Sequence, residues 1–109
     1  MLKNKKCTAC EDKNTKPLSR EEVSKFQEEV SKWNVSPENT FISREFLFDN
    51  FVQSVAFINK VAEIAEGEGH HPDIHCFYNR VRLELSTHSI SGLSENDFIV
   101  ASKIDTVSI

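Results

Sequence analysis

Apolar residues in the first third of the chain recur at the spacing of an amphipathic helix. Ser19 precedes this stretch as a capping residue, and Glu22 stands three positions later, as in a capping box. Leu18 is placed to pack against the first apolar residue of the helix. The apolar positions follow at steps of three, four and three and predict a helix with one buried face: Val23, Phe26, Val30 and Trp33.

The next segment, "NVSPENTFISREFLF", has the composition of two short strands around a turn at Pro37–Asn39, with one strand over Thr40–Leu47. The longest helix is expected after it, from about Asp49 to Glu66. Gly67 follows directly and can end that helix in the left-handed conformation.

This long helix carries two apolar faces. At about 100° per residue, one broad face holds Phe48, Phe51, Val52, Val55, Ala62 and Ala65. The nearly opposite face holds Phe57, Val61 and Ile64. A helix that covers a sheet needs one such face. We therefore expect the first face to cover the sheet and the second to mediate self-association.

Alternating apolar and polar residues in "DIHCFYNRVRLELSTH" predict a β-hairpin. A turn at Asn79–Arg80 would place Cys76 opposite Leu83. The same register, continued, puts His71 opposite His88, and directly paired residues have Cβ atoms about 4.5–5.5 Å apart. The hairpin therefore brings the third histidine back to the pair that precedes it.

The chain ends with a further helix signal, in which Ser94 and Asp97 repeat the capping-box spacing. The resulting order is helix, two strands, helix, hairpin, helix. This order predicts an α+β fold, a four-stranded antiparallel sheet with about three helices packed on one face. Residues 1–17 are expected to form a flexible N-terminal tail, and residues 18–109 a single domain.

Composition narrows the class of protein. A chain of 109 residues forms one domain around one core. The net charge of −4 and the pI near 5.5 argue against direct nucleic-acid binding, since no basic field exists to displace counterions. No apolar run approaches the roughly 20 residues of a membrane span, and the N-terminus lacks the apolar core of a secretory signal. Three cysteines cannot all pair, so we expect a cytoplasmic protein.

Cys7 and Cys10 have the spacing of half a zinc site or of a redox dithiol. A structural zinc ion takes four ligands, and no second pair with matching spacing is present in the sequence. A tail with two incidental thiols is the favoured interpretation.

All four histidines fall in the last 40 residues, and two of them are adjacent in "EGHHPD". Neutral imidazoles could bind zinc, but neighbouring residues of an extended segment point to opposite faces. Acid–base chemistry fits better, because imidazole titrates near neutral pH. The candidate carboxylate partners are Glu66, Glu68 and Asp97. The spacing alone leaves open both an acid–base site and a purely structural cluster, and it marks His75 as an ordinary strand residue.

Several motifs together resemble the pterin-4a-carbinolamine dehydratase family. The resemblance runs from "PLSREEV" through "REFLF" and "VAFINKVAEIAE" to "VASKI". Its most specific parts are His70–His71–Pro72, Tyr78–Asn79–x–Val81, Ser86–Thr87–His88 and Gly92–Leu93–Ser94–x–x–Asp97. The chain departs from the family pattern at Gly67–Glu68–Gly69, where bulkier polar residues are expected before the first histidine.

The resemblance implies dehydration of a 4a-hydroxy-tetrahydropterin to the quinonoid dihydropterin, within the recycling of the pterin used by aromatic amino-acid hydroxylases. It implies no metal and no organic cofactor, because the pterin is the substrate. The assembly implied is a dimer or tetramer. The catalytic set carried over is His70, His71 and His88. The supporting or substrate-binding set is Glu66, Pro72, Ser86, Thr87, Ser89 and Asp97.

Within that set, we assign proton transfer to His70 and His88 and substrate positioning to His71. The alternative function is an oligomeric binding protein or transcriptional dimerisation cofactor that acts through helix packing, as the family also includes proteins resembling such cofactors. The retention of all three histidines favours the enzyme.

Overall fold

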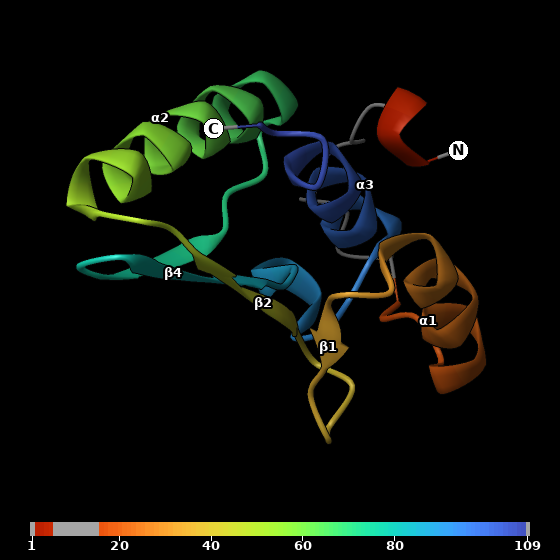
Figure 1. Ribbon diagram of the computed structural model, residues 1–109. Helices are drawn as coiled ribbons and strands as arrows, with labels where there is room; N and C mark the ends of the chain where they lie inside the picture. Colours follow the sequence, from red (N-terminus) through yellow and green to blue (C-terminus); the bar gives the residue numbers. More distant parts are fainter. Residues whose placement is uncertain (1, 6–15, 109) are drawn as a thin grey trace.

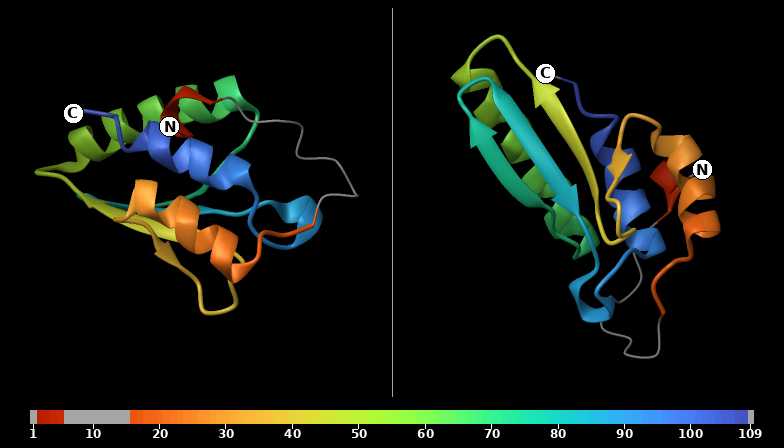
Figure 2. Two further views of the ribbon diagram at one scale, coloured as in Figure 1. Left: turned by 90° about the vertical axis from the view of Figure 1, so that its right-hand side faces the viewer. Right: turned by 90° about the horizontal axis from the view of Figure 1, so that it is seen from below.

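The computed structural model describes residues 2–5 and 16–108, and it has the predicted α+β architecture. Four antiparallel strands form one sheet in the order β1-β2-β4-β3. Figure 1 shows α2 and α3 lying over the sheet, with α1 beside α3, and Figure 2 shows the same layers from two further sides. The strands are β1 (Asn34–Val35), β2 (Ile42–Leu47), β3 (Asp73–Phe77) and β4 (Arg80–Leu85). The helices are α1 (Arg20–Gln27), α2 (Phe51–Glu68) and α3 (Glu95–Ile104), with 3₁₀ turns at Leu2–Asn4, Glu28–Val30 and His88–Ile90.

Both predicted capping boxes are confirmed. At α1 the Ser19 N–H donates to Glu22 Oε1 (3.0 Å) and the Glu22 N–H donates to Ser19 Oγ (3.2 Å). The backbone N–H of Ser19 lowers the pKa of Glu22, because it stabilises the charged carboxylate. At α3 the Ser94 N–H donates to Asp97 Oδ2 (3.0 Å). Each helix therefore begins where the sequence predicts.

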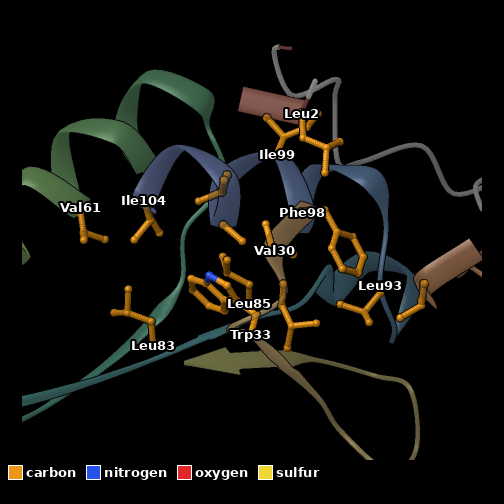
Figure 3. Close-up of a cluster of buried hydrophobic side chains, with 14 of the residues drawn as sticks. Leu2, Val30, Trp33, Val61, Leu83, Leu85, Leu93, Phe98, Ile99 and Ile104 are labelled. Carbon is orange, nitrogen blue, oxygen red and sulfur yellow. The ribbon is translucent and has the colours of Figure 1, made fainter. Parts of the chain in front are cut away.

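The core lies between the sheet and the helices that cover it. From β4, Val81, Leu83 and Leu85 point toward the helices and are fully buried. Figure 3 shows Leu83 facing Val61 of α2 and Ile104 of α3, with Trp33 next to Leu85. The opposite face of the sheet is not covered by any described element and carries charged side chains such as Arg82 and Glu84.

The prediction for the two faces of α2 is wrong. Phe57 and Val61 are buried in the core and Ile64 packs against it, whereas Phe51, Val52 and Val55 are exposed. Aromatic packing accounts for this orientation, because the Phe57 ring lies 4.6 Å from that of Phe46 and 5.1 Å from that of Phe48. The buried face of α2 extends along most of the helix, from Ser54 to Ala65. The large apolar residues of the exposed face occur only near the start of the helix.

Two boundaries also differ from the prediction. The hairpin turn is Tyr78–Asn79, one residue earlier than predicted, with Tyr78 at φ 48°. Consequently Cys76 pairs with Val81, and the predicted pairing of His71 with His88 does not form. Continued beyond the last pair, the observed register places His71 level with Ser86.

The helix α2 ends at Glu68, and its left-handed cap is Gly69 at φ 64° where the prediction has Gly67.

Part of the segment predicted as a tail packs onto the domain. Leu2 is 2% exposed and belongs to the core, and its N–H donates to Glu29 Oε1 (3.2 Å). Lys5 Nζ lies 2.7 Å from Glu95 Oε2, and this hydrogen bond raises the pKa of Lys5.

Cys7 and Cys10 lie outside the described residues. None of the described helices is long and apolar enough to cross a membrane.

Candidate active site

The end of α2 places His70 against the start of α3. Gly69 turns the chain out of the helix, and the His70 N–H still donates to the carbonyl of Ala65 (3.2 Å). The imidazole is 6% exposed, and its Nε2 lies 2.6 Å from Oδ1 of Asp97. A buried imidazole bound to a carboxylate has a fixed ring orientation.

Asp97 is itself held by a second set of hydrogen bonds. It is fully buried, and its Oδ2 accepts from Thr87 Oγ1 (2.8 Å) and from the Ser94 N–H (3.0 Å). Thr87 Oγ1 also lies 2.8 Å from Ser94 Oγ. Because the single hydroxyl proton of Thr87 goes to Asp97, Ser94 is the donor in that contact. The carboxylate is therefore oriented from both the β4 end and the α3 cap.

His71 is placed differently from its neighbour. Its Nε2 lies 2.7 Å from Oε1 of Glu66, but the two side chains are 58% and 78% exposed. An exposed ion pair of this kind contributes at most about 1 kcal/mol. Glu66 can therefore bias the orientation of His71 but cannot fix it as Asp97 fixes His70.

The three predicted catalytic histidines line a single pocket of about 230 Å³. His70 and His71 come from the segment between α2 and β3, and His88 comes from the 3₁₀ turn after β4. The remaining lining residues are Gly69, Ser86, Thr87 and Ser89. A second pocket of about 230 Å³ adjoins the first and shares Ser86, Thr87 and His88 with it. The site thus combines imidazoles with hydroxyl groups.

Other candidate residues lie apart from this pocket. Pro72 is half-buried and leads into β3. His75 is on the uncovered face of the sheet, 4.0 Å from Glu84, and lines neither pocket. Glu68 points to α3 and lies 2.7 Å from Lys103 Nζ. Sequence reasoning named Glu68 as a partner for a histidine and missed Lys103, because nothing local marks a contact between residues 35 positions apart.

A metal centre finds no support in the described part of the chain, where no three His, Cys, Asp or Glu side chains are grouped to share an ion. The carboxylates near the histidines each contact a different partner. Asp97 contacts His70, Glu66 contacts His71 and Glu68 contacts Lys103. The pairs with Asp97 and Glu66 can orient and polarise imidazoles.

Comparisons with known proteins agree with this geometry. The family model described as pterin 4 alpha carbinolamine dehydratase matches residues 16–107. A protein of Nitrosospira multiformis, provisionally named as a pterin-4-alpha-carbinolamine dehydratase, is 46% identical over 97% of this chain and 91% of its own length. Pterin-4-alpha-carbinolamine dehydratase 2, mitochondrial, of Arabidopsis thaliana is 36% identical over 99% of this chain and 59% of its own length.

Solved structures show the same fold. A transcriptional coactivator/pterin dehydratase from Brucella melitensis superposes with a TM-score of 0.77 at 31% identity, over 82% of this chain and 95% of its own. A pterin dehydratase-like protein identified as a RuBisCO assembly factor in the alpha-carboxysome has a TM-score of 0.59 at 23% identity, over 68% and 86% of the two chains. The second likeness concerns the fold alone. By family model, by relatives and by fold, the chain belongs to the pterin-4a-carbinolamine dehydratase family.

Proposed function

We propose that this hydro-lyase dehydrates a 4a-hydroxy-tetrahydropterin through histidine acid–base catalysis, within pterin recycling. The observation that carries the proposal is that His70, His71 and His88 line one pocket, together with hydroxyl groups. No metal or organic cofactor takes part in the proposed reaction, and the pterin is the substrate.

The chemistry requires two proton transfers. The C4a–O bond breaks, and the leaving oxygen takes a proton from a general acid and departs as water. The lone pair of N5 forms the C4a=N5 double bond, and the N5 proton passes to a base. A protonated and a neutral imidazole can supply these steps, each of which contributes typically about 10²–10⁴-fold.

His70 and His88 are the proposed proton-transfer residues. The Asp97 carboxylate holds the His70 ring through its contact with Nε2. His88 lies where the two adjoining pockets meet. His71, which contacts the exposed Glu66, is proposed to position the substrate. Ser86 and Ser89 are proposed to contact the polar edges of the pterin. Thr87 is proposed to act through Asp97, because its hydroxyl donates to that carboxylate.

The test follows the appearance of the quinonoid dihydropterin from a synthetic 4a-carbinolamine, above the rate in buffer alone. We expect the wild-type protein to accelerate dehydration and His70→Ala or His88→Ala to lower kcat by about 10²-fold or more. His75→Ala is the matched control, since His75 lies on the uncovered sheet face, and it should keep its rate. Equal losses at His75 and His88 would contradict this assignment.

We also propose that the protein is a homo-oligomer, built on a surface other than the one predicted from sequence. All five residues of the edge strand β3 are exposed, and an edge strand presents unpaired backbone groups. The exposed start of α2 adds large apolar side chains, with Val52 at 75% exposure. An identical edge in a second copy is self-complementary in an antiparallel pairing, so a second copy of this chain is the proposed occupant.

The assembly is measured by light scattering. Val52→Glu should shift the protein toward smaller species, because it places like charges at the proposed contact. Ser24→Glu, on the exposed side of α1, is the matched control. A wild-type monomer at high micromolar concentration would contradict the proposal. It would count equally against the alternative function, an oligomeric binding protein or transcriptional dimerisation cofactor. The predicted cytoplasmic location stays a prediction.

A further inference from the structure

The C-terminal end of α2 lacks the basic residue that commonly stabilises a helix end. A helix C-terminus carries a partial negative charge and is stabilised by cations. The last turn of α2 contains no basic residue and ends instead with the carboxylates of Glu66 and Glu68. These charges lie immediately before the adjacent histidines His70 and His71. Glu66 is exposed to water and contacts His71, whereas the side chain of Glu68 is only 9% exposed and needs a compensating charge from outside the helix.

That compensation comes from α3. Lys103 Nζ donates to Glu68 Oε2 at 2.7 Å, and the two side chains are 20% and 9% exposed. Water screens so enclosed an ion pair poorly, and removing the lysine would leave a nearly buried carboxylate less well compensated. The lysine is itself favourably placed, because it lies in the last turn of its own helix.

Among the polar contacts of the described residues, this ion pair is one of two that join the end of α2 to α3. The other is the contact between His70 Nε2 and Asp97 Oδ1. Asp97 and Lys103 are six residues apart, or about 9 Å along a helix at about 1.5 Å per residue. Two attachments separated along one helix restrict both the position and the rotation of the segment between them. That segment is Glu68–Gly69–His70, in which Gly69 itself provides little stiffness.

From this geometry we infer that Lys103, acting through Glu68, is a positioning residue for the catalytic histidine His70. The inference rests on the proposed function of His70, and it identifies a residue that does not line the pocket. Without the ion pair, Gly69 would allow the start of the histidine segment to move against α3. Misplacement of a catalytic group by about 1 Å can cost about 10²-fold in rate.

The experiment compares Lys103→Met with Glu68→Gln and with the reversed pair E68K/K103E. We expect Lys103→Met to lower kcat by about 10- to 100-fold and to change KM by less than about threefold, since the pocket lining is unchanged. Glu68→Gln keeps an acceptor for the lysine and should cost less. The reversed pair should recover most of the loss. Lys5→Met is the matched control, because its ion pair with Glu95 has the same 2.7 Å length on the same helix but is exposed.

A second readout does not depend on activity. The ¹⁵N and ¹H resonances of the His70 imidazole should shift and broaden in Lys103→Met but not in Lys5→Met. If Lys103→Met does not fold, the same comparison is made with Glu68→Gln. The inference fails if folded Lys103→Met keeps its kcat, or if the reversed pair recovers nothing. An inactive wild-type protein would refute the proposed function instead, and the His70 resonances would still test the positioning.

Discussion

Replacement of Asp97 by Asn tests whether the buried carboxylate orients His70. The substitution keeps the shape of the side chain and removes its charge. Two donors, Thr87 Oγ1 and the Ser94 N–H, point at Oδ2. The amide oxygen of Asn will therefore occupy that position, and the NH₂ group will face His70 Nε2.

An NH₂ group can only donate, so Nε2 of His70 must then accept. The imidazole proton moves to Nδ1, and the hydrogen bond between Nε2–H and a carboxylate is lost. A hydrogen bond to a charged group contributes about 1.5–3 kcal/mol. At about 1.36 kcal/mol per factor of ten, we expect kcat to fall by about 10- to 150-fold. The free energy of unfolding should fall by a similar amount.

The assay measures kcat for carbinolamine dehydration and the tautomer of His70 by ¹⁵N NMR. Asp105→Asn is the matched control, since Asp105 lies at the end of the same helix and accepts from Trp33 Nε1 (2.8 Å) and Arg44 Nη1 (2.6 Å). It should lose stability and keep its kcat. The reasoning is refuted if Asp97→Asn keeps kcat within about twofold, or if both variants lose activity equally.

Two further predictions concern the absence of a metal and the N-terminal thiols. Dialysis against a chelator should leave the dehydration rate unchanged; loss of activity that zinc restores would disprove the metal-free mechanism. Changing Cys7 and Cys10 together to Ser should leave the unfolding midpoint and kcat unaltered; a large fall in the midpoint would instead indicate a metal site or a disulfide.

Sequence periodicity was sufficient to predict the helices and strands, because each of them depends on residues that lie close together in the chain. The capping boxes at Ser19 and Ser94 and the alternation in β4 are readable within a few residues. The hairpin turn was misplaced by one residue because Tyr78, which adopts φ 48°, is not a residue type that marks a left-handed position. Such positions are normally signalled by Gly or Asn.

The orientation of α2 could not be derived from periodicity. Two apolar faces are present in the sequence, and the choice between them depends on the Phe46 and Phe48 rings that receive Phe57. The family motifs name three histidines, and these line one pocket. The contacts of Asp97 with Thr87 and of Glu68 with Lys103 join separate elements, so their existence required the structure.

Helix α3 contributes residues both to the candidate site and to the core. This explains how the buried carboxylate of Asp97 is held in place. The side chain that follows Asp97 in the chain is Phe98, which is fully buried and stacks on Phe26 with ring centroids 5.4 Å apart. Protein cores are close-packed, so a helix fixed by such contacts cannot rotate freely. The position of the Asp97 carboxylate therefore depends on core packing as well as on its own hydrogen bonds. No described residue gives His88, in an exposed 3₁₀ turn, comparable support. The proposed acid–base pair thus joins one imidazole held by the core to one on an exposed turn.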